Sequence, residues 1–225
     1  MKADAVSKFI EQELPALCRA ETSSEAGYAL PPGSLAVLRG CVERLGVLRV
    51  FEFGTGQSTH LFLAAGCTVT AVEDSAVWLA ETEGKMDAMA RERFTPHLLP
   101  QQRIWHRGAP VQSWALPAVA LEALRAADLV LVDSPALPPS REHALAISLA
   151  EAREALVVVD DVNIPTVTRF CRRLTERNGA AHFQTPLDHG LFFCGPATRV
   201  PLDDKRSVLE TLKAWRRYFH PRRGA

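Results

Sequence analysis

The chain has 225 residues, of which 47% are hydrophobic, and 26 basic residues balance 26 acidic ones. This size and composition suit a single globular domain with a continuous core. Because the formal net charge is zero, no overall field draws the protein to nucleic acid or an anionic membrane, so we expect a small-molecule partner. The cysteines lack metal-ligand spacing and charges interrupt the apolar stretches of the N-terminus, so we expect a cytoplasmic protein.

The first elements in chain order are two helices, predicted over Ala5–Ala20 and Ser34–Leu45 on either side of a Pro/Gly-containing loop. They form an N-terminal helical cover over residues 1–45, which is a candidate to close over a ligand or to form a homodimer face. Short apolar runs with helical segments between them then predict strands at Leu48–Phe53, Cys67–Glu73, Arg103–His106, Leu129–Asp133, Leu156–Asp160, His182–Gln184 and Leu191–Cys194.

The end of this core has its own signals. A helix is predicted after Asn163, with Pro165 near its start and Gly179 as its stop. The segment Thr185–Gly190 is too short for a crossover helix, so the last two strands should pair as an antiparallel hairpin. A basic segment over residues 203–225 is predicted to be a helix that packs its aromatic residues on the domain, with an RNA-binding tail as the alternative.

These elements predict an α/β, Rossmann-like fold over residues 46–196. Its seven-stranded, mostly parallel sheet should have the strand order 3-2-1-4-5-7-6, with the last strand antiparallel and helices on both faces. The runs Leu129–Val132 and Leu156–Val159 are apolar without alternation, as strands covered on both faces should be.

A glycine loop follows the first strand. Glu52 is followed by Gly54-Thr55-Gly56, and a helix begins near Ser58. The two glycines permit the close approach of a ligand that a Cβ would block. A dinucleotide fingerprint would have glycine or alanine where Thr59 stands, so the loop is not typical of NAD binding.

The loop resembles the first motif of the class I S-adenosylmethionine-dependent methyltransferases. The resemblance implies that Glu73, at the end of the second strand, accepts the ribose hydroxyls, and that the segment after the third strand contacts adenine. The cofactor-binding residues implied in this way are Glu52, Gly54, Thr55, Gly56, Ser58, Glu73, Asp74, Gly108, Ala109 and Asp133.

Three carboxylates end neighbouring strands: Asp133 follows the fourth strand, and Asp160 and Asp161 follow the fifth. In a parallel sheet they should converge beside the cofactor loop. Three carboxylates placed together repel, and the usual remedies are a raised pKa or a bound hard cation such as Mg²⁺. A second interpretation remains open: one of Asp160 and Asp161 caps the following helix and the other faces water, while Asp133 only supports the substrate loop.

At these residues the chain resembles the cation-dependent, catechol-type O-methyltransferases. The resemblance implies that Asp133, Asp160 and Asp161 hold magnesium. Those enzymes usually have a catalytic lysine where this chain has Ala136. The candidates for a catalytic base are therefore His143, His189 or a metal-bound carboxylate such as Asp133.

A second resemblance is to the sugar-directed methyltransferases, including those that act on glucuronic acid. It rests on the run from Val72 to Trp78, on Asp133-Ser134-Pro135 with Arg141, and on Val159–Val162. In that interpretation Arg141 pairs with a substrate carboxylate; otherwise it is a solvated residue of a helix's first turn.

We therefore predict an S-adenosylmethionine-dependent methyltransferase that methylates an oxygen of a small molecule by in-line displacement, with a divalent cation as an optional helper. Two alternatives are a metal-free sugar or uronic-acid O-methyltransferase and a catalytically silent S-adenosylmethionine-binding protein.

Overall fold

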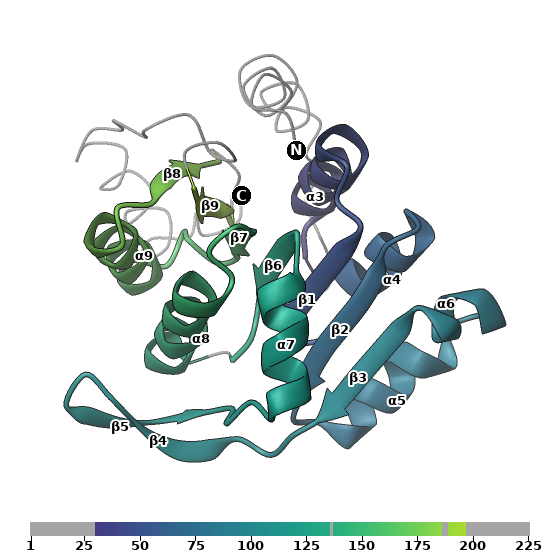
Figure 1. Ribbon diagram of the computed structural model, residues 1–225, viewed down its shortest axis with the longest axis horizontal. Helices are drawn as coiled ribbons and strands as arrows, with labels where there is room; N and C mark the ends of the chain where they lie inside the picture. Colours follow the sequence, from purple (N-terminus) through teal and green to yellow (C-terminus); the bar gives the residue numbers. More distant parts are fainter. Residues whose placement is uncertain (1–29, 136, 186–188, 197–225) are drawn as a thin grey trace, which may run out of the picture.

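The computed structural model describes residues 30–135, 137–185 and 189–196, which form one α/β unit (Figure 1). The predicted helix Ala5–Ala20 and the predicted basic helix over residues 203–225 lie outside the described residues. The described residues include the two expected central strands and the helix that follows Asn163. In the described part of the chain, no helix is long and apolar enough to cross a membrane.

A seven-stranded sheet forms the centre of the fold, in the order β3-β2-β1-β6-β7-β9-β8. The strands β1, β2, β3, β6 and β7 are parallel, and β9 runs antiparallel to both of its neighbours. The predicted strand order and antiparallel last strand are confirmed. The strands are β1 (Arg49–Phe53), β2 (Thr68–Glu73), β3 (Phe94–Leu98), β6 (Leu129–Val132), β7 (Leu156–Val159), β8 (Ala181–Gln184) and β9 (Phe192–Gly195).

The third strand is not the one that the sequence predicts. The predicted segment Arg103–His106 lies in β4 (Gln102–His106), which pairs with β5 (Ala109–Ser113) in a separate antiparallel hairpin. The third strand of the main sheet is β3, which contains Pro96. Proline cannot donate a ladder hydrogen bond and so weakens the strand signal, but β3 lies at the sheet edge, where proline is tolerated.

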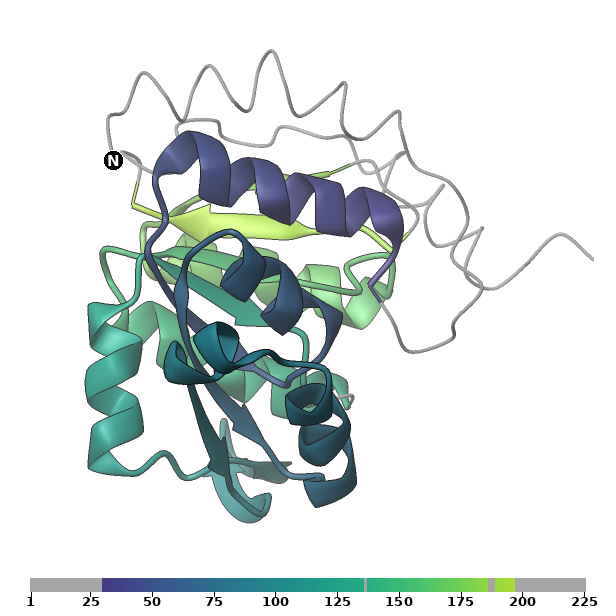
Figure 2. The same cartoon turned by 90° about the vertical axis from the view of Figure 1, so that its right-hand side faces the viewer.

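Helices cover both faces of the sheet (Figures 1 and 2). Two separate clusters of buried apolar residues, one on each face, make up the core. The first cluster joins the sheet to α3 (Pro32–Leu45), α4 (Gln57–Ala64), α5 (Ala76–Gly84) and α6 (Ala88–Glu92). The second joins it to α7 (Ala118–Ala126), α8 (Pro138–Glu151) and α9 (Pro165–Arg177).

The side chains of β1 divide between these clusters, because successive residues of a strand point to opposite faces. Phe51 and Phe53 belong to the cluster beneath α7, α8 and α9, and their ring centroids lie 5.2 Å apart. Val50 belongs to the other cluster. The first strand is therefore fixed from both faces, and its carboxyl end carries the glycine loop.

We expect Phe51→Ala to lower the free energy of unfolding by about 3–5 kcal/mol, because it empties a fully buried aromatic site. Urea titration followed by circular dichroism measures this change. Leu48→Ala is the matched control, since Leu48 is 66% exposed and its loss should change the free energy by less than about 0.5 kcal/mol. Equal effects of the two variants would contradict this description of the core.

Candidate functional site

The carboxyl ends of β1 and β6 meet at the glycine loop. The Gly54 N–H donates to the Val72 carbonyl at 2.9 Å, and the Ser134 N–H donates to the Phe53 carbonyl at 2.8 Å. Gly54 has a φ of 99°, and a Cβ there would lie 2.9 Å from the Cβ of Ser134. Glycine is therefore required at this position by the neighbouring loop as well as by the backbone conformation.

Glu52 is tied to the glycine loop through Thr59. The Gly56 N–H donates to Thr59 Oγ1 at 3.0 Å, and that hydroxyl donates to Glu52 Oε2 at 2.7 Å. A dinucleotide fingerprint would have glycine or alanine at position 59. The Thr59 hydroxyl that stands there instead holds the carboxylate of Glu52. Glu52 Oε1 is buried and has no hydrogen-bond partner among the described residues. Burial raises the pKa of Glu52 to about 7, although hydrogen bonds from Ser58 and Thr59 oppose the rise.

Glu73 holds the residue between the two glycines. One carboxylate oxygen accepts the Thr55 N–H at 3.1 Å and the Thr55 hydroxyl at 3.0 Å. The other oxygen accepts the N–H groups of Asp74 and Ser75, each at 3.0 Å. The predicted ribose acceptor therefore also organises the loop and the start of α5.

Gly108 and Ala109 were expected to contact adenine because they follow the predicted third strand. They lie instead at the β4–β5 turn, where Arg107 and Gly108 have φ values of 51° and 81°. Arg107 Nη1 donates to Glu142 Oε1 of α8 at 3.2 Å. Their assignment rested on a third strand at Arg103–His106, and that strand assignment is wrong.

The segment that does follow the third strand begins after β3 with Leu99. In this segment, the side-chain amide of Gln101 donates to Asp74 Oδ2 at 2.9 Å. The sequence pattern did not point to the segment that contains Gln101, because it did not identify β3 as the third strand.

A cavity of about 270 Å³ opens beside the glycine loop. The predicted residues that line it are Thr55, Gly56, Ser58 and Asp133, and Trp78 joins them from α5. Its remaining lining residues are Leu30, Gln57, His60, Glu81, Thr82 and Lys85. The cavity therefore joins the cofactor loop to one of the three strand-end carboxylates.

Arg141, at 3% exposure, lies between the loops that follow β6 and β7. Its Nη1 donates to Asp161 Oδ2 at 2.7 Å and to the Asp160 carbonyl at 3.2 Å. Its Nε donates to the Pro135 carbonyl at 3.1 Å, and Nη2 donates to the Asp133 carbonyl. Arg141 is thus neither the solvated residue nor the free guanidinium for a substrate carboxylate that the sequence suggested.

The three strand-end acids converge as expected, but Arg141 changes their electrostatics. Its guanidinium lies between Asp133 and Asp161, with Nη2 at 4.0 Å from Asp133 Oδ1. Burial, together with the charges of Asp133 and Asp161, raises the pKa of Asp160 well above its ordinary value. The guanidinium of Arg141 and the raised pKa of Asp160 therefore both reduce the repulsion among the three acids, which a bound Mg²⁺ was predicted to relieve.

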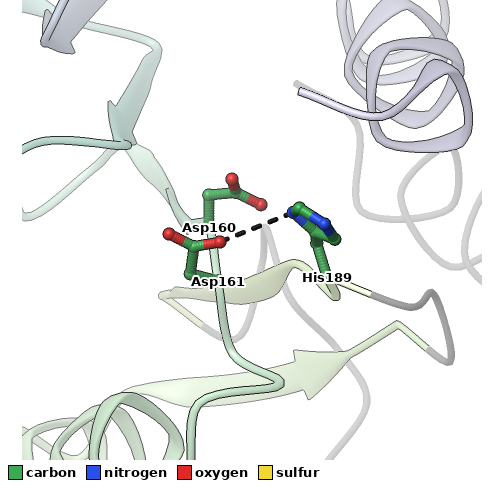
Figure 3. A group of neighbouring side chains, drawn as sticks. All are labelled: Asp160, Asp161 and His189. Atoms are coloured by element: carbon green, nitrogen blue, oxygen red, sulfur yellow. Dashed lines mark ion pairs between the residues drawn. The ribbon is translucent and has the colours of Figure 1, made fainter. Parts of the chain in front are cut away.

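The residues that could hold a metal also differ from the predicted set. Among the described residues, ligand atoms of Asp160, Asp161 and His189 lie within 4.8 Å of one another, and Asp133 is not part of that group (Figure 3). His189 comes from the segment between β8 and β9, far from the two acids in sequence. No periodic or short-range pattern in the sequence indicates this contact.

His189 and Asp161 form a pair, with Nδ1 of the imidazole at 3.5 Å from Asp161 Oδ1 (Figure 3). Asp161 has a φ of 59°, a left-handed conformation that aspartate tolerates better than most residues. The Asn163 N–H donates to the His189 carbonyl at 2.8 Å. Burial would raise the pKa of Asp161, but His189 and Arg141 outweigh it and lower the pKa, so Asp161 stays ionised.

His143, the other predicted base, is placed differently. Its Nδ1 lies 2.9 Å from Ser113 Oγ of β5, and its ring contacts that of His106 at 5.3 Å between centroids. Burial and the neighbouring His106 lower the pKa of His143. This histidine therefore packs between α8 and the β4–β5 hairpin, and of the two predicted bases it is His189 that lies beside the strand-end acids.

No model of a known protein family matches the chain, and no curated protein sequence matches it. Its structure resembles the SAH-bound methyltransferase PaMTH1 of Podospora anserina, with 13% identity, 85% of this chain and 87% of that chain covered, and a TM-score of 0.53. A Staphylococcus aureus protein assigned as a caffeoyl-CoA O-methyltransferase gives 13% identity, coverage of 84% and 94%, and a TM-score of 0.54.

A third similar structure is the precorrin-6y C5,15-methyltransferase from Geobacter metallireducens GS-15, with 13% identity, coverage of 78% and 93%, and a TM-score of 0.51. At this level of identity the likeness shows a shared fold. The chain therefore has the fold of these methyltransferases over most of its length.

We expect Arg141→Met to lower the free energy of unfolding by about 3–5 kcal/mol, because it leaves Asp161 and three carbonyl groups without their buried partner. Arg125→Met removes an exposed ion pair with Glu151 and should cost at most about 1 kcal/mol. Urea denaturation compares the two variants. A loss for Arg141→Met no larger than that of Arg125→Met would show that the guanidinium does not organise the site.

Proposed function

We propose that this protein transfers a methyl group from S-adenosylmethionine to a hydroxyl oxygen of a small molecule. The observation that carries the proposal is the buried Glu52, whose Oε1 has no hydrogen-bond partner in the described part of the chain, although Thr59 holds the carboxylate against the glycine loop. A buried carboxylate oxygen without a hydrogen bond is costly, and a ligand ammonium would satisfy Oε1. The shared fold with three methyltransferases agrees with this assignment.

The residues of the loop fit S-adenosylmethionine in two respects. Glu52 offers an acceptor for the ammonium of its methionine part, and Gly56, which lines the cavity, has no Cβ to block the approach of the cofactor. When bound, the cofactor supplies a methyl group on a sulfonium. We assign Glu52, Gly54, Thr55, Gly56, Ser58 and Glu73 to its binding.

We further propose that His189 accepts the proton of the acceptor hydroxyl. Asp161 faces Nδ1 of the imidazole, so the proton passes to Nε2 as the oxygen attacks the methyl group. The ionised Asp161 holds the ring in place and stabilises the imidazolium that forms. This chain has Ala136 where the cation-dependent O-methyltransferases usually have a catalytic lysine, and we assign the role of that lysine to the His189–Asp161 pair.

A divalent cation on Asp160, Asp161 and His189 is the second candidate for activating the hydroxyl. The clustering of their ligand atoms favours it. The ion pair of Arg141 with Asp161 weighs against it, because a cation there would lie close to a guanidinium. Since imidazole suits zinc better than magnesium, such a site would prefer zinc to the predicted Mg²⁺.

The uronic-acid alternative loses its main support in the structure, because protein oxygens already occupy Nε, Nη1 and Nη2 of Arg141. A catalytically silent S-adenosylmethionine-binding protein would bind the cofactor without forming product. Measurement of S-adenosylhomocysteine formation separates that alternative from the proposed enzyme.

S-adenosylhomocysteine should bind about tenfold more weakly at pH 6 than at pH 8. With a pKa of about 7, Glu52 is mostly ionised at pH 8 and mostly protonated at pH 6, and only the carboxylate attracts the ligand ammonium. Titration calorimetry at several pH values measures the change. In Glu52→Gln the affinity should be lower at pH 8 and nearly independent of pH, so an unchanged pH profile in this variant would place the ammonium elsewhere.

Replacement of His189 by Gln should lower the rate of methyl transfer by about 100-fold or more while leaving S-adenosylhomocysteine affinity unchanged. A panel of phenol, catechol and sugar acceptors with S-adenosylmethionine gives the rate as S-adenosylhomocysteine formed. His143→Gln is the control and should retain activity, because His143 contacts Ser113 and not the acids.

Under the proposed mechanism EDTA leaves the wild-type rate unchanged. Loss of activity in EDTA and its recovery with Mn²⁺, Zn²⁺ or Mg²⁺ would replace the His189 base by the metal mechanism. Equal rates for His189→Gln and the wild type would exclude both roles for this histidine.

A further inference from the structure

Trp78 covers the glycine loop from the first turn of α5. Its backbone N–H donates to Ser75 Oγ at 3.2 Å, which caps the helix, and its indole Nε1 donates to the Thr55 carbonyl. A Cβ on Gly56 would lie 3.6 Å from both Cζ2 and Nε1 of the indole, so the ring lies directly over this glycine. At 41% exposure, Trp78 has one side on the cavity and another open to solvent.

All the polar groups of Thr55 form hydrogen bonds with Glu73 or Trp78. Its N–H and hydroxyl donate to one oxygen of Glu73, and its carbonyl accepts the indole N–H of Trp78. A residue flanked by two glycines has few other restraints on its conformation. These three hydrogen bonds therefore set the shape of the loop in this state.

Glu73 has no acceptor capacity left for a ligand. A carboxylate has about four lone-pair sites, and Glu73 receives hydrogen bonds from Thr55 N–H, Thr55 Oγ1, Asp74 N–H and Ser75 N–H. The vicinal diol of a ribose would need two acceptor positions on this carboxylate. The diol can bind only if Thr55 withdraws its two donors.

We propose that Trp78 and Thr55 form a latch on the cofactor cleft, and that Trp78 becomes part of the binding site for the adenosyl group. In the latched state Thr55 occupies Glu73, and the indole covers Gly56. Binding transfers one oxygen of Glu73 from Thr55 to the ribose diol, releases the indole from the Thr55 carbonyl and turns its ring onto the nucleoside. The inference rests on the proposed function, because it takes S-adenosylmethionine or its product as the ligand.

The latch makes loop opening a step that precedes tight binding. The observed association rate should therefore approach a limit as the ligand concentration rises. Phenylalanine at position 78 keeps an aromatic ring but lacks the N–H donor to Thr55. Trp78→Phe should raise the limiting rate about fivefold, the change that corresponds to loss of one hydrogen bond of about 1 kcal/mol.

Rapid mixing of the full chain with radiolabelled S-adenosylhomocysteine, followed by filtration, gives the association rate of every variant, and tryptophan emission in stopped flow reports the movement of the indole. Wild type should change its emission as the indole leaves the Thr55 carbonyl, and Trp78→Phe should lose most of that change. Trp105→Phe is the control, since Trp105 is 72% exposed on the β4–β5 hairpin and should leave both signal and rate unchanged. Titration calorimetry with S-adenosylhomocysteine gives the affinity of each variant independently of emission.

Three results are distinguishable. A saturating rate in wild type that rises in Trp78→Phe supports the latch. Wild-type binding with the same rate and the same emission change in Trp78→Phe overturns the latch and leaves the proposed function intact. Absence of binding to folded wild type, Trp105→Phe and Trp78→Phe alike overturns the proposed function itself.

Discussion

The acceptor side of the site depends on one buried guanidinium. The side chain of Arg141 is buried. It joins the loop after β6 to the loop after β7, because it donates hydrogen bonds to carbonyl groups of both loops and to the carboxylate of Asp161. Parallel strands bring their carboxyl ends to one edge, where loops with acidic residues would otherwise repel one another. The guanidinium makes that convergence favourable because its planar fork can satisfy several oxygens at once.

The geometry of His189 follows from this arrangement. Arg141 holds Oδ2 of Asp161, and the left-handed backbone of Asp161 presents Oδ1 to the imidazole. The backbone of the β8–β9 connection is tied to the same loop through Asn163. The proposed base is therefore positioned by a chain of contacts that starts at a residue in α8 and crosses two loops.

The cofactor side of the site uses different forces. Hydrogen bonds from Gly56 to Thr59 and from Thr59 to Glu52 hold the loop after β1, and Glu73 holds Thr55. These bonds are local, and none of them involves a buried cation. The β4–β5 hairpin, by contrast, is bound to the helical layer by Glu142, which contacts Arg107, Arg173 and His106. This separate cluster accounts for the position of His143 away from the strand-end acids.

Much of the fold could be predicted from the sequence, because apolar runs and turn residues report the period and the ends of each element. Leu129–Val132 and Leu156–Val159 identified two inner strands, and Gly54 and Gly56 identified the loop after β1. The strand β3 was missed because Pro96 disrupts the pattern, and only the edge of a formed sheet makes that residue acceptable.

The partners of the charged side chains were decided by the tertiary structure alone. The sequence placed Asp133, Asp160 and Asp161 at one edge through topology, but it could not show that Arg141 neutralises them or that His189 lies beside Asp161. Neither contact has a periodic or short-range signature. Each forms between segments that meet only after the sheet and both helical layers have assembled, and burial at that point determines which charges must be paired.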